Sequence, residues 1–312
     1  MRIDHDKVTQ MKITKGMSVS DLLKEYDNSG VLGAGRISDA SNLLAKMLNN
    51  KDMKVFMSLA GPQVPGGLRN IISDMIKNEQ IDVIVSSGAN ITHDLLESFG
   101  GRHYKDFGRD DKSLNEAGIG RIENVYTQND DFEVFEEEIT KIFTKISEEI
   151  GEEIITIHDL LRKIGLLIDD ENSILYQAAK HDVDIFAPGI IDSMFGLQLW
   201  MFTQDHNLTL DAVEDMHLFS DIVFDAKEIG AIFLGGGLPK HYTMASTLLK
   251  GGLDAAIQIT MDRPEAGSLS GAPLEEAKSW SKAKIESNLA NVIGDSTIIF
   301  PLILAAALDK IE

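Results

Sequence analysis

A unit of one short apolar run, one glycine-rich or polar turn and one helical pattern recurs along this chain and restricts the folds open to it. Residues 54–60 precede GPQVPGG, residues 81–86 precede SGAN, and residues 231–234 precede GGGLPKHY. Residues 184–186 and 255–260 are two further candidate strands. Continuous apolar strands alternating with amphipathic helices are typical of a parallel sheet covered on both faces. We therefore predict an α/β fold: a Rossmann-like open, mostly parallel sheet with helices on both faces.

The domain organisation is predicted to be simple. The 312 residues suit one large α/β domain as well as two small ones, and no long linker, low-complexity tract or fixed-period repeat divides them. We predict a single domain over residues 1–312 with a helical lead-in over about residues 1–50. An acidic amphipathic stretch within residues 132–180 is predicted to be structural, with its charge run on a solvated face.

The charge balance and the absence of cysteine exclude several classes of function. The 29 basic and 50 acidic residues give a net charge of −21, which disfavours nucleic acid and anionic membranes and favours small cations and basic proteins. Without cysteine there is no disulfide, thiolate nucleophile or Cys-ligated zinc, and we predict no metal site. The start lacks a signal-peptide pattern, and the most apolar segment, residues 298–308, is about half the ~20 residues of a membrane span. We expect a soluble, cytoplasmic protein.

Residues Gly33–Ser38 approach the dinucleotide-binding fingerprint but have serine at the third glycine. The preceding residues do not form a strand, although the fingerprint requires strand, turn and helix in that order. We predict a loop here, and this segment gives no argument for nicotinamide binding.

The glycines of Gly235–Gly237 are more informative, because they follow a buried strand and precede a helix. Such a turn lets a ligand approach the backbone closely, and the helix N-terminus favours anions. His241 lies just beyond and could act as a base. A tight turn without a ligand and a structural histidine are the alternatives.

A flexible loop, residues 265–273, precedes a predicted helix over residues 274–282. Glu276 and Trp280 are four residues apart and share a helix face, where a carboxylate beside an indole suits a cationic amine. Lys282 would lie about 200° round the helix from Trp280. Either the helix ends near Ser281, or Lys282 and Trp280 serve different sides of a cleft.

Several segments in order resemble the deoxyhypusine synthase family. GGGLPKHY, GSLSGA, EEAKSWSK and GDSTIIFPLILA are similar to the family's G-G-G-x-x-K-H-H, D-G-S-D-S-G-A, E-A-x-S-W-G-K and D-A-S-x-x-F-P-L. Upstream, SSGANITHDLLE and FAPGIIDSMFG are similar to its archaeal members. The resemblance extends over nearly the whole chain from about residue 30 and implies the deoxyhypusine synthase fold.

The resemblance implies an NAD-dependent transferase. Family members oxidise spermidine, catch its aminobutyl group as an imine on a lysine, and pass it to a lysine of the initiation factor 5A precursor. Lys282 corresponds to the imine-forming lysine, and His241 to a histidine that can move a proton. Glu276 and Trp280 correspond to the residues that hold the polyamine. An imine forms only on an unprotonated lysine, and hydride transfer requires a dry pocket.

The resemblance also implies a cofactor pocket and an assembly. The residues expected to contact NAD are Ala60, Gly61, Ser87, Gly88, Ala89, Asp192, Gly235, Gly236, Asp295 and Ser296. Family members are homotetramers with sites between paired subunits, so we expect a homotetramer here.

Three acidic positions of the family pattern are changed. Leu197 replaces the second aspartate of D-G-S-x-G-D, and Ala266 and Leu269 replace the two aspartates of D-G-S-D-S-G. These changes leave the amine donor open: a related enzyme could use agmatine, or a free amine acceptor as in homospermidine synthesis. An NAD-binding scaffold with a vestigial site is the non-enzyme alternative. A short-chain dehydrogenase is a weaker one, because the chain lacks the glycine fingerprint and a Tyr-x-x-x-Lys pair.

Overall fold

A six-stranded parallel sheet forms the centre of the protein, which we describe from a computed structural model covering residues 5–311. The strand order is β11-β10-β9-β1-β2-β7, and every neighbouring pair is parallel. The strands are β1 (Met53–Leu59), β2 (Val83–Ser86), β7 (Asp184–Phe186), β9 (Glu228–Leu234), β10 (Leu253–Thr260) and β11 (Ala283–Ile293). The predicted parallel α/β fold is confirmed, and the first five of these strands coincide with the predicted runs. Strand β11 was not predicted.

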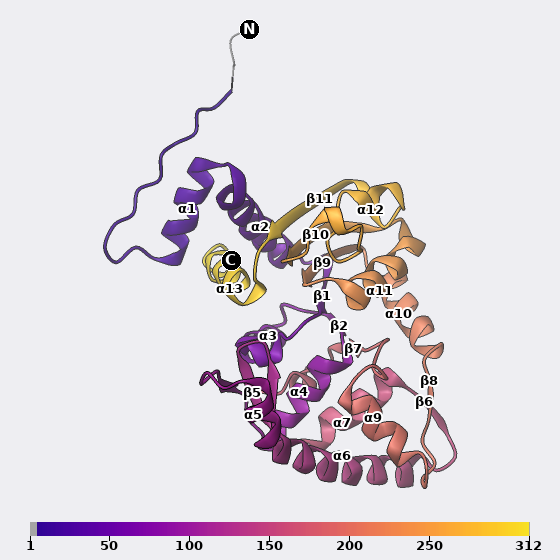
Figure 1. The fold of residues 1–312 in the computed structure, drawn as a ribbon. Helices are drawn as coiled ribbons and strands as arrows, with labels where there is room; N and C mark the ends of the chain where they lie inside the picture. The colour runs from indigo at the N-terminus through magenta and orange to yellow at the C-terminus, as the bar shows by residue number, and fades with distance from the viewer. Residues whose placement is uncertain (1–4, 312) are drawn as a thin grey trace.

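Helices cover both faces of the sheet, as predicted (Figure 1). Side chains alternate along each strand: in β1, Val55 and Met57 join one buried cluster and Phe56 joins the other. Among the helices that contribute to the first cluster, three lie on one side: α2 (Leu32–Asn49), α3 (Arg69–Lys77) and α13 (Ser296–Leu308). Among those that contribute to the second are α10 (Glu214–Asp225) and α11 (Gly237–Thr247). Burial on both faces explains why the strands are continuous apolar runs.

The remaining elements surround this core. The helices are α1 (Val19–Ser29), α4 (Gly88–Ser98), α5 (Asp111–Glu116), α6 (Asn129–Ile150), α7 (Ile157–Leu167), α8 (Ile174–Lys180), α9 (Met194–Phe202) and α12 (Glu276–Ser279), with short helical turns η1 (Val64–Leu68), η2 (Leu248–Lys250) and η3 (Pro264–Ala266). One small sheet contains β3 (Tyr104–Lys105), β4 (Ile119–Ile122) and β5 (Val125–Gln128). A second contains β6 (Ile154–Thr156) and β8 (Thr209–Asp211). The predicted acidic helix is α6, which buries Phe135, Ile139 and Phe143 at helical spacing.

Two apolar or glycine-rich segments have clear structural roles. The apolar C-terminal segment forms α13, which buries Phe300 and Ile303 in the core. No helix within residues 5–311 has the length and apolar character needed to cross a membrane.

The loop predicted at Gly33–Ser38 is wrong, because these residues lie inside α2. A Cβ on Gly35 would come within 2.6 Å of the backbone carbon of Gly30, so close packing of α1 against α2 outweighs the cost of glycine in a helix, about 1 kcal/mol.

Candidate functional site

A cavity of about 1220 Å³ opens at the carboxyl edge of the sheet. Its wall includes the turns after β1, β9, β10 and β11, together with residues of β3 and of the β4–β5 hairpin. Ligands of open parallel sheets bind at this edge. Of the residues predicted to contact a cofactor, six line the cavity: Ala60, Gly61, Gly235, Gly236, Asp295 and Ser296.

Glycines allow the turns around the cavity to approach one another. Gly235 has a φ of 83°, and a Cβ there would lie 2.8 Å from the carbonyl oxygen of Ala60. A Cβ on Gly236 would lie 2.5 Å from the Cα of Ser270. Both positions therefore require glycine, because a side chain would prevent the close approach. Gly235 also requires it for its positive φ. At these two turns the cavity wall is therefore formed by backbone.

Two buried amide side chains, those of Gln63 and Asn90, fix these turns, and neither was predicted from the sequence. The Gln63 side chain donates to the carbonyl oxygen of Ala60 (2.5 Å) and accepts from the hydroxyl of Ser296 (2.8 Å). The Asn90 side chain donates to the carbonyl oxygen of Gly61 (3.0 Å) and accepts from the N–H of Val64 (3.2 Å). Each amide therefore joins turns that are distant in the sequence. The sequence offered one signal for both residues, which is an amide side chain next to a glycine-containing turn that follows an apolar strand.

Four predicted cofactor residues lie at the same sheet edge but do not line this cavity: Ser87, Gly88, Ala89 and Asp192. They follow β2 and β7, the two strands at the other end of the sheet. A Cβ on Gly88 would come within 2.6 Å of the hydroxyl of Ser193. The turns after β2 and β7 therefore contact each other directly.

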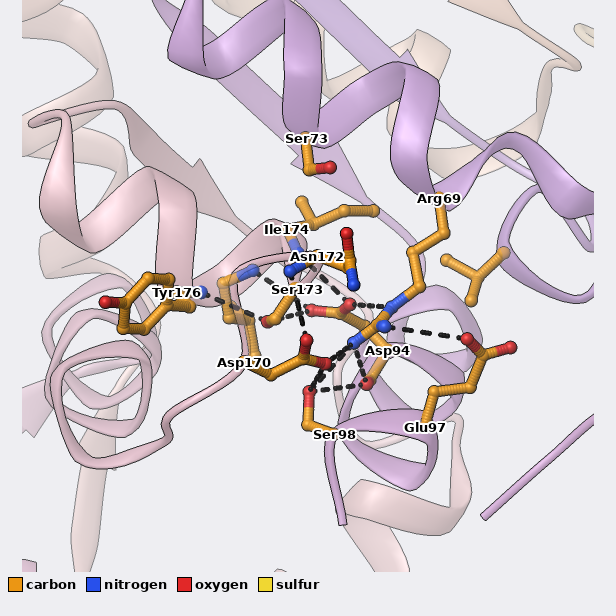
Figure 2. Close-up of polar contacts among 12 residues, drawn as sticks. Arg69, Ser73, Asp94, Glu97, Ser98, Asp170, Asn172, Ser173, Ile174 and Tyr176 are labelled. Carbon is orange, nitrogen blue, oxygen red and sulfur yellow. Dashed lines mark hydrogen bonds and ion pairs between the residues drawn. The ribbon is translucent and has the colours of Figure 1, made fainter. Parts of the chain in front are cut away.

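A buried ion-pair network anchors the segment that follows the cavity turn (Figure 2). Arg69, the first residue of α3, donates from Nε to Asp94 (2.7 Å) and from Nη2 to Asp170 (2.7 Å), and its Nη1 lies 3.5 Å from Glu97. Asp94 is 1% exposed and also accepts from the hydroxyl of Ser173 and two backbone N–H groups of α8. The network joins α3, α4 and α8, and so holds one end of η1, whose residues line the cavity.

His241 lies in a helix rather than in the glycine turn. Helix α11 begins at Gly237, and Pro239 is accommodated in its first turn, where no intrahelical N–H bond is needed. The N–H of Gly237 donates to the hydroxyl of Ser270 (2.7 Å), which links α11 to the loop before α12. The His241 side chain is exposed. It is therefore available to a ligand outside the cavity.

The helix predicted over residues 274–282 is much shorter, because α12 ends at Ser279. Ser281 then adopts a φ of 55°, which turns the chain. The Nζ atom of Lys282 consequently lies 5.7 Å from the centre of the Trp280 ring. This confirms the first of the two alternatives, in which the helix ends before the lysine. Trp280 is 64% exposed and Glu276 is also exposed, while Lys282 is half-buried.

The candidate site thus has two adjoining parts. His241, Glu276, Trp280 and Lys282 do not line the cavity, and within residues 5–311 no hydrogen bond joins His241 to the other three. Ser270 connects the parts, since it lines the cavity and bonds to α11. The described residues include no group of three or more His, Asp or Glu placed to hold a metal ion. The arrangement offers an amine, an imidazole, a carboxylate and an indole beside a cavity large enough for a dinucleotide.

The family model and the curated relatives agree on one family. A family model described as deoxyhypusine synthase matches residues 21–307. A protein of Methanothermobacter thermautotrophicus named "probable deoxyhypusine synthase" is 58% identical over 97% of this chain and 98% of its own length. One from Methanopyrus kandleri with the same name is 41% identical over 95% of each chain. A solved structure from Entamoeba histolytica, described as a "putative deoxyhypusine synthase", shares the fold with a TM-score of 0.70 and 20% identity, covering 95% of this chain and 94% of its own.

Proposed function

Since the chain belongs to the deoxyhypusine synthase family, a family of transferases, we propose that it transfers an aminobutyl group from spermidine to a lysine of the initiation factor 5A precursor. The observation that carries this proposal is the pairing of Lys282 with Trp280 beside a backbone-walled cavity of about 1220 Å³. An aromatic ring next to an amine nucleophile suits a cationic donor.

We propose NAD as the cofactor, held in the cavity. The residues present fit such a group: the volume exceeds that of ordinary ligand pockets, and the glycine turns expose backbone on which a dinucleotide can lie. Ala60, Gly61, Gly235 and Gly236 would contact it through their backbones, and Asp295 and Ser296 would offer polar side chains. Bound NAD would supply the hydride acceptor and donor that the reaction requires. The predicted contacts of Ser87, Gly88, Ala89 and Asp192 would extend the pocket toward β2 and β7.

Lys282 is the proposed nucleophile. After losing its proton, its Nζ attacks the oxidised carbon of the donor, and the diaminopropane portion of spermidine leaves as an amine. The acceptor lysine then displaces Lys282 by the same exchange of one C=N bond for another, and the hydride taken from the donor would return to this last C=N bond to give the secondary amine. His241 would take and return the protons, while Trp280 and Glu276 would hold the cationic end of the donor through the ring face and the carboxylate charge.

The partners and the assembly are part of the same proposal. The net charge of −21 favours cationic partners, which suits a polyamine and a lysine-bearing acceptor protein. We propose that the chain acts as one cofactor-binding domain in a cytoplasmic homotetramer. The exposure of His241, Glu276 and Trp280 in the single chain supports a site that a second subunit completes.

A second candidate function is transfer from another amine donor or to a free amine acceptor. It is favoured by Leu197, Ala266 and Leu269, which stand where the family pattern has aspartates. Leu197 is 43% exposed and Leu269 is half-buried, so packing in the hydrophobic core does not account for a leucine at either position. Each ammonium group buried without a partner costs several kcal/mol. A donor with a different spacing of charges, such as agmatine, would then be preferred.

We expect NAD to raise the melting temperature, because a ligand at a hundredfold excess over its Kd stabilises the native state by about 2.7 kcal/mol. Asp295→Ser should reduce this shift while keeping the helix cap, since Asp295 caps α13 and serine caps equally well. Asp192→Ala should also reduce it if the pocket extends to the turn after β7. Asp211→Ser, outside the cavity, is the control. Calorimetry that detects no NAD binding at millimolar concentration would refute the cofactor assignment.

A donor panel distinguishes the two candidate functions. We expect the protein to use spermidine but to bind it weakly. The double variant Leu197→Asp, Leu269→Asp should lower the KM for spermidine about tenfold, since two ion pairs at partly exposed positions contribute up to about 1 kcal/mol each. Leu249→Asp, which adds an acid at an exposed position of η2, is the matched control. Micromolar KM in the native protein with no gain from the aspartates would contradict this account of the two leucines.

A further inference from the structure

Lys240 is a lysine buried beside the candidate site, with only 1% of its surface exposed. Its Nζ donates to three neutral oxygens: the side chain of Gln258 (2.9 Å), the carbonyl of Leu269 (2.9 Å) and the carbonyl of Ala272 (2.8 Å). An ammonium group has three N–H donors. All of them are therefore used inside the protein, although Lys240 directly precedes the exposed His241.

The partners of Lys240 belong to the loop of residues 267–273 and to the strand beneath it. Gln258, which is 2% exposed in β10, accepts from Lys240 and donates to the carbonyl oxygens of Ser270 (2.8 Å) and Gly235 (3.3 Å). Lys240 and Gln258 together thus hold three carbonyl groups of the loop. Gln258 was detectable in the sequence as a polar residue inside an apolar strand.

The loop needs such anchoring because it lies between two cavities. Ser270 lines the cavity of about 1220 Å³, whereas Gly271, Ala272 and Gln258 line a second cavity of about 490 Å³. A wall with open space on both sides has fewer packing contacts to fix it, although its backbone packs closely against Gly236 and Arg263. The hydrogen bonds from Lys240, Gln258 and the N–H of Gly237 add to these contacts in fixing its position.

Lys240 is not a second nucleophile, although its chemistry would suggest one. Burial lowers the pKa of Lys240 to about 8, with the charge of Glu276 acting in the opposite direction. A lysine with a lowered pKa in an active site is often catalytic. Here the nitrogen is enclosed and saturated with acceptors, so a substrate cannot reach it.

We propose that Lys240 is a positioning residue, which holds the loop of residues 267–273 as the wall between the cavities of about 1220 Å³ and about 490 Å³. The effect on the loop follows from the contacts alone. The effect on catalysis rests on the proposed function, because the loop carries Leu269, the position where the family pattern has a donor-binding aspartate. Lys240 would act through this loop without touching the donor.

Hydrogen exchange measured by mass spectrometry tests the proposal directly. In Lys240→Met, amides of residues 267–272 should exchange about tenfold faster or more, the factor expected when a charge-assisted hydrogen bond is lost. Exchange in β1 and β9 should stay unchanged. Lys284→Met is the matched control, because Lys284 is half-buried and bonds to Asp254 (2.6 Å) away from the loop. Unchanged exchange of the loop would overturn the proposal.

Gln258→Met provides a second variant, which keeps the test decisive if Lys240→Met does not fold. It should produce the same loop-specific increase in exchange, and the double variant should show less than the product of the two effects, because both residues hold the same segment. Independent, multiplicative effects would overturn the proposal. In the transfer assay, the KM for the donor should rise about tenfold in both variants. Loosening of the loop in a protein without transfer activity would refute the proposed function but support the positioning role.

Discussion

Replacing Lys282 with alanine should reduce aminobutyl transfer by at least about a thousandfold, the order of loss seen when a covalent nucleophile is removed. Lys282→Arg should be equally inactive, because a guanidinium group stays protonated and forms no imine. Borohydride should trap a donor adduct on the native protein and none on either variant. NAD binding should persist in both, because Lys282 does not line the cavity.

Lys227→Ala is the matched control for this experiment. Lys227 precedes β9, at the amino edge of the sheet and away from the cavity, where it pairs with Asp52 on the surface. Its loss should leave transfer within about twofold of native, since exposed ion pairs contribute roughly 0–1 kcal/mol. Substantial transfer by Lys282→Ala or Lys282→Arg would remove Lys282 from the mechanism.

Asp94→Ala should lower the free energy of unfolding by about 3–5 kcal/mol, the cost of removing one partner from a buried ion pair. The substitution takes a carboxylate from Arg69 and leaves the hydroxyl of Ser173 and two N–H groups of α8 without their acceptor. Such a loss is a large fraction of the stability of a typical domain. Urea denaturation followed by circular dichroism measures it.

Asp74→Ala is the control in this case. Asp74 lies in α3, as Arg69 does, but its side chain is 63% exposed and it pairs loosely with Lys77 at 3.6 Å. This change should cost less than about 1 kcal/mol. Equal losses for Asp74→Ala and Asp94→Ala would show that the network of Figure 2 has no special weight in stability.

The strands that could be predicted from the sequence are those buried on both faces. In β9 and β10 almost every residue is buried, so the apolar run is continuous and visible. Strand β11 was missed because it is the edge strand, where buried Ala290 and Val292 alternate with exposed or half-buried residues and no continuous buried run forms. The helical segment over Gly33–Ser38 was mistaken for a loop because Gly35 serves a contact between helices, and that contact depends on tertiary structure.

The residues of the candidate site could be proposed from the sequence, but their arrangement in space could not. The glycine turns and the residues around Trp280 were identified from their order along the chain. The approach of Lys282 to Trp280 depends on the positive φ of Ser281, which a serine rarely adopts and no local pattern predicts. The anchoring role of Lys240 depends on two carbonyl groups about 30 residues later in the chain, which only the folded structure brings to it.

The order of the strands has a consequence for synthesis of the protein. Strand β1 is central, yet one of its two neighbours is β9. During synthesis, Met53 can pair with Glu228, and Leu59 with Leu234, only after β9 has been made. A ribosome adds about 5–20 residues per second, so the apolar edge of β1 stays unpaired for on the order of ten seconds after it emerges. The turns at Ala60 and Gly235 meet only after that delay. A nascent chain therefore lacks the complete cavity during this interval, and the unpaired edge of β1 is open to pairing with other chains.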